Sequence, residues 1–338
     1  MSLFSRFFNK NPSVTRFQMV TEKGNGYYAW NGKLYHSDIV RSCIRPKARA
    51  IGKLVAKHIR NNQQEGFKVN PEPYIKFLLE DPNPYMSGQM LQEKIATQLE
   101  LNNAFIYIHR DDNGYPVELY PIQALNAEAM YDRSGLLYLK FVMQNGKIVT
   151  FPYSDIIHLR QDYNDNDIFG ESPAAALVSL MEVVNTTDQG IVKAIKNSNV
   201  IRWLLKFTQS LRPEDIKKNV DQLVENYLST TTSSVGAAGT DAKADVTQVT
   251  PHDYVPNAAQ IDRTTQRIYS FFNVNDKIIQ SKYTEDEWNA YFESVIEPLA
   301  TQMGNEYTRK LFTRRERGFG NKIIFEASSL QYAAMKTK

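Results

Sequence analysis

The chain has 338 residues, of which 42% are hydrophobic and 23% charged, a balance that is typical of folded proteins and argues against wholesale disorder. Its single cysteine, Cys43, excludes a disulfide framework and a cysteine-based zinc site, and no stretch approaches the roughly 18 apolar residues that span a membrane. The net charge of +3 divides into +10 over residues 1–70 and −7 over the rest, which fits a nucleic-acid or acidic partner, or only a solvated basic face.

The first 36 residues are interpreted as an irregular N-terminal arm. Their apolar start, MSLFSRFFNK, is short and interrupted by Arg6, so it does not fit a signal peptide and we expect synthesis in the cytosol. Ser37 can cap a helix that begins at Asp38. The apolar stripe that follows continues to Ile59, which predicts a helix over this span that Pro46 should bend or restart.

Two helices and several strands are predicted next. PEPYIKFLLEDPNPYMSG, residues 71–88, indicates a short helix stopped by prolines, and Ser87 can cap a second helix that ends near Asn102. From Ala104 the apolar period changes to two, and turns of the type DDNG and QNGK separate the runs. Residues 104–160 are therefore predicted to form a mostly antiparallel sheet.

The acidic stretch QDYNDNDIFGESPAAALVSL, residues 161–180, raises the alternative of a calcium loop. An EF-hand loop needs a carboxylate at its twelfth position, where the two possible registers place Pro173 and Ala176. Ser172 can instead accept from a free amide as the helix N-cap, and Pro173 suits the first helical position. We expect a turn that starts a helix, and no metal site.

The second half of the chain is predicted to be mainly helical, with a small α/β insertion. The apolar spacing predicts helices over residues 173–197, 213–227, 257–272 and 285–312, strands over 200–207, 245–250 and 322–330, and a loop over 273–283. Thr284 and Glu287 form a capping-box pattern at the start of the last long helix. Pro298 lies inside that helix and should kink it.

Motifs for catalysis are absent from the sequence. No phosphate-binding loop, dinucleotide fingerprint, nucleophile elbow or zinc-protease motif occurs, and the five histidines show no ligand spacing. These observations favour a protein that is not an enzyme and holds no cofactor. A hydrolase with dispersed acidic residues remains an alternative, since distant carboxylates can meet in a fold.

Four segments, in order, resemble the portal (head–tail connector) proteins of long-tailed double-stranded-DNA bacteriophages. They are LLEDPNPYMSGQMLQEKIATQLELNNAFIYIHRDDNGYPVELYPI, DIIHLRQDYNDNDIFGESPAAAL, IYSFFNVNDKII and WNAYFESVIEPLATQMGNEYTRKLF, within residues 37–330. The chain departs from the family pattern where a proline usually stands, at Asn275 or Asp276, and at Asn103, where a glycine is frequent.

The resemblance implies an α+β, phage-portal-like fold with a mixed α/β wing, a helical stem, a small α/β clip and a helical C-terminal region. The implied parts are an N-terminal arm at 1–36, a wing at 37–170, stem helices at 171–198 and 256–272, a clip at 199–255, a tunnel loop at 273–283, and the long kinked helix, wing strand and short or truncated crown at 284–338.

The implied function is a ring at one capsid vertex, usually of twelve subunits, that conducts double-stranded DNA without reading its sequence. The implied partners are a terminase motor, a capsid or scaffold protein and a head–tail adaptor, in a virion assembled in the bacterial cytoplasm, with no role for a membrane. A ring-forming virion adaptor that does not conduct DNA is the alternative.

Candidate residues follow from this mapping. The candidates for the DNA tunnel are Lys277, Lys282, Asn273, Asn275, Gln280, Lys193 and Lys196. The candidates for subunit contact, taken from the apolar stripes of the stem helices, are Leu177, Met181, Val184, Ile191, Ile261 and Ile268. Sparse cations suit a channel, because each phosphate neutralised adds affinity that would slow the passage of DNA.

Overall fold

A computed structural model describes residues 18–19, 33–63, 66–101, 103–162, 167–172, 174–198, 202–207, 212–223, 244–249 and 258–327. The chain divides into two compact units, Met1–Leu180 with Thr265–Lys338, and Met181–Thr264. No helix among the described residues is long and apolar enough to cross a membrane. The N-terminal arm and the possible crown lie almost entirely outside the described residues.

The first long helix of the larger unit is shorter than its apolar stripe predicts. Helix α2 (Asp38–Gly52) follows the short α1 (Lys33–His36), starts after Ser37 and continues through Pro46. The expected continuation to Ile59 is wrong, because the chain becomes strand β2 (Leu54–Asn62). Leu54 and His58 are both buried in this strand, and their spacing of four suits either a helical turn or one face of a strand.

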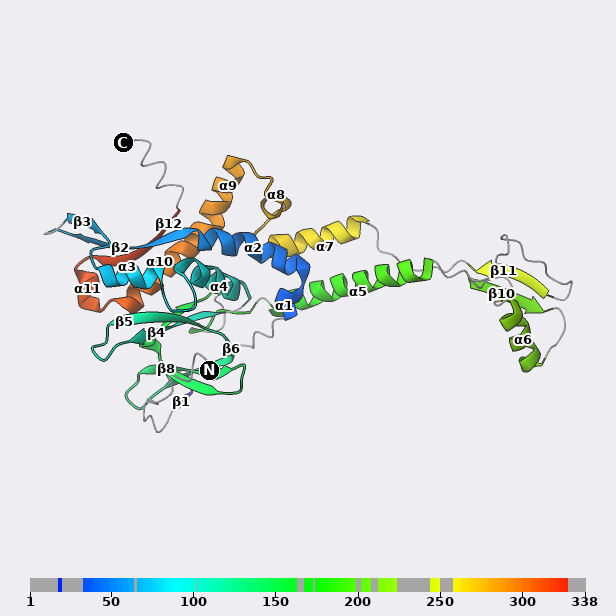
Figure 1. Ribbon diagram of the computed structural model, residues 1–338, viewed down its shortest axis with the longest axis horizontal. Helices are drawn as coiled ribbons and strands as arrows, with labels where there is room; N and C mark the ends of the chain where they lie inside the picture. The colour runs from blue at the N-terminus through cyan, green and yellow to red at the C-terminus, as the bar shows by residue number, and fades with distance from the viewer. Residues whose placement is uncertain are drawn as a thin grey trace. The chain divides into compact units, whose positions relative to one another are not determined.

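Strand β2 is the middle strand of a three-stranded antiparallel sheet. Its neighbours are β3 (Gly66–Val69) and β12 (Asn321–Ala327), so the last described strand pairs with one of the first, as Figure 1 shows. His58 Nε2 lies 2.8 Å from Asn321 Oδ1 across this pairing. Helix α10 (Glu297–Leu311) packs on β12, where Gly304 leaves no space for a Cβ against the Ile323 carbonyl.

Two further helices are confirmed where sequence period predicts them. Helix α3 (Pro73–Glu80) ends before the prolines at 82 and 84, and α4 (Gly88–Leu101) begins after Ser87, whose hydroxyl accepts from the Met90 amide. Helix α4 packs on α2. Lys47 of α2 and Glu100 of α4 form a buried ion pair of 2.8 Å there.

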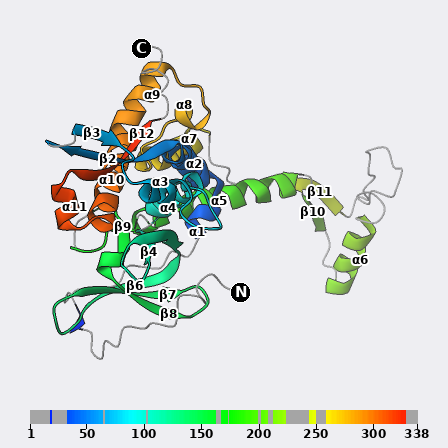
Figure 2. The same ribbon diagram turned by 60° about the vertical axis from the view of Figure 1, so that its left-hand side comes forward.

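The strands between residues 104 and 160 form two sheets rather than one. The first is antiparallel in the order β5 (Pro116–Ile122), β4 (Ala104–Arg110) and β9 (Ile156–Leu159). The second has the order β1 (Gln18–Met19), β6 (Ala124–Tyr131), β7 (Leu137–Met143) and β8 (Ile148–Pro152), and Figure 2 labels its last three strands. Sequence period missed β6, whose inward residues include the small Ala127 and Ala129.

One hydrophobic core joins these two sheets. Phe105 of β4 meets Phe141 of β7 edge to face at 5.0 Å, and Leu139 and Ala127 are fully buried in the same cluster. Edge-to-face geometry suits the charge distribution of aromatic rings. The cluster fixes β4 and β9, and through them the chain that leaves β9 for the acidic turn.

The smaller unit contains strand β10 (Arg202–Phe207), helix α6 (Pro213–Leu223) and strand β11 (Ala244–Val249). Strands β10 and β11 pair antiparallel over six residues each. Helix α5 (Ala174–Ser198) and helix α7 (Ala258–Phe271) each cross the boundary between the two units along the chain. These helices and strands agree with the predicted order of helix, strand, helix, strand and helix.

The C-terminal part of the larger unit is a helical path that returns to the sheet. It contains α8 (Asp276–Ile279), α9 (Glu285–Tyr291), a π-helical turn (Phe292–Ile296), α10, and α11 (Arg314–Gly318) before β12. The capping box of Thr284 and Glu287 is present as predicted. Pro298 follows the π-helical turn and has no amide hydrogen for the helical ladder.

Candidate functional site: residues 273–283 and their surroundings

The segment 273–283 is held firmly by apolar side chains at one end and in its middle. Phe272, Val274 and Ile278 are all at most 7% exposed. The Val274 amide donates to the Tyr269 carbonyl of α7 over 3.0 Å, and the Lys282 amide donates to the Lys277 carbonyl over 2.8 Å. The first bond attaches the start of the segment to α7, and the second closes a turn within the segment itself.

The expected irregular loop contains the short helix α8. Asn275 accepts a hydrogen bond from the Ile278 amide over 3.0 Å and so acts as the N-cap. Asn273 and Ser281 take left-handed backbone conformations, with φ of 54° and 57°, on either side of the helix. Asparagine tolerates this region better than most residues, which explains one turn in a segment without glycine.

All five tunnel candidates of this segment have exposed side chains. They are Asn273, Asn275, Lys277, Gln280 and Lys282. The two lysines differ in their surroundings. Lys277 forms an ion pair with Glu287, and the hydrogen bond from Lys277 lowers the pKa of the Glu287 carboxyl. Lys282 has no ion-pair partner among the described residues, so its charge is the more available one.

The apolar stem candidates separate into two groups. Leu177 and Ile268 are fully buried within the chain itself, which corrects their assignment to subunit contact. Met181, Val184, Ile191 and Ile261 are half-buried. Sequence period did not single out Val183 and Val192 of α5, which are 50% and 49% exposed. Each lies next to a residue of the apolar stripe but outside it, and an apolar residue outside the stripe of a helix is the sequence signal that could have indicated them.

Other predicted positions are only partly described. Lys193 and Lys196 lie in α5, but their side chains are outside the described residues, as is Pro173. The Ser172 hydroxyl donates to the Leu101 carbonyl over 3.3 Å. That hydrogen bond ties the start of α5 to the end of α4.

A buried polar group holds the end of the acidic turn. Asn103 uses its amide side chain like a strand partner: it donates to the Gly170 carbonyl over 2.8 Å and accepts from the Gly170 amide over 2.9 Å. His158 Nε2 lies 2.9 Å from Asn103 Oδ1, and burial lowers the pKa of this histidine well below its usual value. No group of three potential metal ligands occurs among the described residues.

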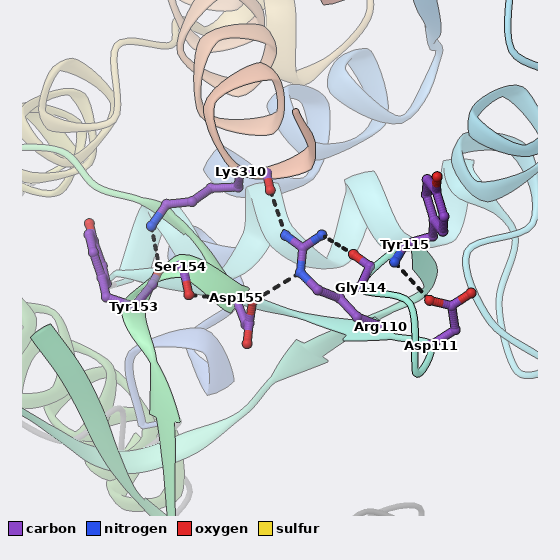
Figure 3. Close-up of polar contacts among 8 residues, drawn as sticks. All are labelled: Arg110, Asp111, Gly114, Tyr115, Tyr153, Ser154, Asp155 and Lys310. Carbon is purple, nitrogen blue, oxygen red and sulfur yellow. Dashed lines mark hydrogen bonds and ion pairs between the residues drawn. The ribbon is translucent and has the colours of Figure 1, made fainter. Parts of the chain in front are cut away.

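A second polar cluster joins the C-terminal end of α10 to the β5-β4-β9 sheet, and Figure 3 shows its members pointing toward one another. Arg110 donates to Asp155 over 3.0 Å, to the Gly114 carbonyl over 3.1 Å and to the Lys310 carbonyl over 2.8 Å. The Lys310 ammonium donates to the Tyr153 carbonyl and lies over the Tyr153 ring. Burial lowers the pKa of Lys310 to about 8.

This cluster fixes α10, which continues from α9 and Glu287. Its groups satisfy one another, and an arginine that uses three nitrogens on three oxygens is an orienting residue rather than a chemical one. The arrangement therefore supports the 273–287 region mechanically. Together, the described site is an exposed polar surface whose apolar residues Val274 and Ile278 are buried in the larger unit.

Comparison with solved structures gives the fold a class. The chain is similar to the neck of an empty gene transfer agent (GTA) particle computed with C6 symmetry, with a TM-score of 0.68 and 13% identity over 90% of this chain and 85% of the other. It is also similar to the neck of a native particle computed with C12 symmetry, with a TM-score of 0.64 and 13% identity over 93% and 89%. A third similar structure is an HK97-family phage portal protein from Corynebacterium diphtheriae, with a TM-score of 0.57 and 10% identity over 91% and 98%.

The fold is thus the mixed α and β fold of phage portal structures, as predicted. A family model described as phage portal protein matches residues 38–338. The chain therefore belongs to the phage portal protein family, which is a family of structural proteins rather than enzymes. No curated protein sequence matches it.

Proposed function

We propose that the chain is the subunit of a portal ring at one capsid vertex, the channel for packaging and ejection of double-stranded DNA. The observation that carries this proposal is the family match over residues 38–338, supported by the same fold in a phage portal structure. The protein would be a virion component, assembled in the cytoplasm of a bacterial host. Its partners would be the terminase motor, a capsid or scaffold protein and a head–tail adaptor.

Twelve copies are the proposed number in the ring. A similar structure comes from a particle neck computed with C12 symmetry, which supports this number. A head-to-tail interface closes such rings, so each subunit presents two different surfaces to its neighbours. The half-buried Met181, Val184, Ile191 and Ile261 are the proposed contacts, joined by the exposed Val183 and Val192.

The proposed parts keep the boundaries of the sequence mapping. The larger unit would contain the wing, with β12 as its returning strand, and the smaller unit would contain the clip. Helices α5 and α7, which cross the boundary between the units along the chain, would be the stem. The segment 273–283 would face the channel, where exposed amides and Lys282 can contact phosphates without reading bases.

Negative-stain electron microscopy of the purified chain, with light scattering for mass, tests this function. Closed rings with a central hole wide enough for duplex DNA are expected. Closed rings without such a hole would favour the adaptor alternative. A chain that stays monomeric alone and with its capsid or scaffold protein would overturn the ring.

A further inference from the structure

A row of cations follows one exposed face of α2. Arg45 and Arg49 of α2 and Lys53, the C-cap residue directly after the helix, are spaced by four residues, and all three side chains are exposed. With a helical rise of 1.5 Å per residue, successive members lie roughly 6 Å apart along the axis. We name Arg45, Arg49 and Lys53 the α2 cation row.

The α2 cation row borders the segment 273–283. All three residues line one surface depression, and its other wall comes from α8, the loop that follows it and the start of α9. The members of that wall are Ile278, Ile279, Ser281, Tyr283 and Trp288. Tyr283 and Trp288 stack on each other at 5.0 Å, so their rings are already paired.

The three cations of the row form no ion pair on the side of the row that faces α8 and α9. No aspartate or glutamate lines this depression, and none of the three cations has an ion-pair partner among the described residues. By contrast, Lys47, which lies within α2, is buried and paired with Glu100. On the other flank, Arg45 and Arg49 border a second depression, which Glu93 and Lys94 of α4 also line.

The elements packed around the row also carry acidic groups. Glu93 of α4 lies against Gly52, the residue before Lys53, and lines the second depression together with Arg45 and Arg49. Asp276 begins α8 and Asp38 begins α2. Neither belongs to the lining of the depression. The depression is therefore lined by positive charge, whereas residues 71–338 of the chain are net negative.

We infer that the α2 cation row, with Lys282, binds the phosphodiester backbone of double-stranded DNA. This inference rests on the proposed portal function and adds a binding surface outside the segment 273–283. Duplex DNA presents a phosphate charge about every 1.7 Å along its axis, so a row of this length faces several phosphates.

The test compares purified rings of the wild type and of Arg45→Gln/Arg49→Gln/Lys53→Gln for binding to a fluorescein-labelled duplex of mixed sequence over a range of salt. The matched control is Arg133→Gln/Arg314→Gln/Lys322→Gln, which removes three exposed charges elsewhere in the larger unit. Ring mass is measured for all three proteins by mass photometry. Arg45→Lys/Arg49→Lys serves as the conservative variant.

The triple variant of the row is expected to form normal rings and to bind DNA roughly tenfold more weakly at about 0.1 M salt. The slope of log affinity against log salt should become shallower by about 0.9 for each phosphate that the variant no longer neutralises. The control should change much less, and the lysine variant should restore binding.

Two outcomes overturn the inference and leave the portal function standing. Normal rings with DNA binding equal to the control would show that the row does not contact phosphate. Failure of only the row variant to form rings would show that the row contacts the next subunit instead. If the wild type itself formed rings that do not bind or admit DNA, the proposed function would fail as well.

Discussion

Lys277 of α8 is held by Glu287 of α9, and the same carboxylate closes the capping box by accepting from the Thr284 amide over 2.9 Å. The Glu287 side chain therefore both stabilises the start of α9 and neutralises a cation of the proposed channel surface. A cation that is neutralised locally contributes little to phosphate binding. The two lysines of the segment should therefore differ in function despite their similar exposure.

Glu287→Gln is expected to strengthen the binding of DNA to the ring. Glutamine keeps an oxygen for the Thr284 amide, as a capping box allows, and removes the charge that neutralises Lys277. The slope of log affinity against log salt should steepen by up to about 0.9 for each additional phosphate neutralised. Salt-dependent fluorescence anisotropy measures this, with Lys277→Gln as the control that should change little. A weaker affinity in Glu287→Gln would contradict the role of the pair.

Leu177→Ala is expected to lower the stability of the subunit. Leu177 is fully buried. Truncation of such a leucine costs about 2–5 kcal/mol of unfolding free energy, because the hydrophobic burial of the removed atoms is lost and a cavity remains. Urea unfolding followed by circular dichroism would show a lower midpoint. A midpoint equal to that of the wild type would show that the side chain is not packed as described.

Val183→Asp is expected to prevent ring formation while the subunit stays folded. The side chain is 50% exposed in the single chain, so the carboxylate costs little until a neighbouring subunit covers it. Size-exclusion chromatography with light scattering measures the assembly. Asn185→Asp, an exposed position on the same helix, adds the same charge as a control. Intact rings of Val183→Asp would remove this residue from the interface.

Lys310 should make stability depend on pH in the alkaline range. Its pKa in the folded chain is about 8 and its ordinary value is 10.5, so between these values the unfolded chain binds more protons and folding becomes more favourable as pH rises. Below about pH 8 both states carry the proton, and the full cost of the buried charge is present. The gain should be on the order of 3 kcal/mol at most.

Thermal unfolding of the wild type and Lys310→Met between pH 7 and pH 10.5 would measure this gain. All other titrating groups are the same in the two proteins, so the difference in their stability reports on Lys310. Any stability advantage of the variant should shrink or reverse as pH rises, because the wild type becomes more stable. A constant difference across the range would disprove a depressed pKa.

The buried ion pair of Lys47 and Glu100 gives a fifth prediction. Glu100→Gln leaves an uncompensated buried ammonium and should cost about 3–5 kcal/mol of unfolding free energy. The double variant Lys47→Met/Glu100→Leu removes both charges and should recover most of that stability. Urea unfolding of the three proteins decides this, since a double variant as unstable as Glu100→Gln would show that packing rather than charge is responsible.

Much of the fold could be predicted because the signals are local. Helices α3 and α4, the hairpin of β4 and β5, and the capping box at Thr284 depend on neighbours within a few residues, and the structure confirms them. Strand β2 was missed because a spacing of four suits both periods, and its partner β12 lies more than 250 residues further along the chain.

The candidate site was less predictable, because its contacts depend on how separate elements pack together. The resemblance located the exposed segment 273–283, but the pairing of Lys277 with Glu287 requires a contact between two helices. Burial of Leu177 and Ile268 depends on the whole unit, since an apolar stripe looks the same whether it faces a core or a neighbouring subunit. The α2 cation row became recognisable only when α8 and α9 were placed beside it.

The π-helical turn Phe292–Ile296 allows α9 and α10, which are continuous along the chain, to face different partners. A π-helical turn accommodates one residue more than an α-helical turn, and each residue advances an α-helix by about 100°. The side chains of α9 are thus rotated out of phase with those of α10. Helix α10 can face β12 while α9 presents Glu287 to α8. Deleting a single residue here would restore a uniform helix and turn one of these two faces toward the wrong partner.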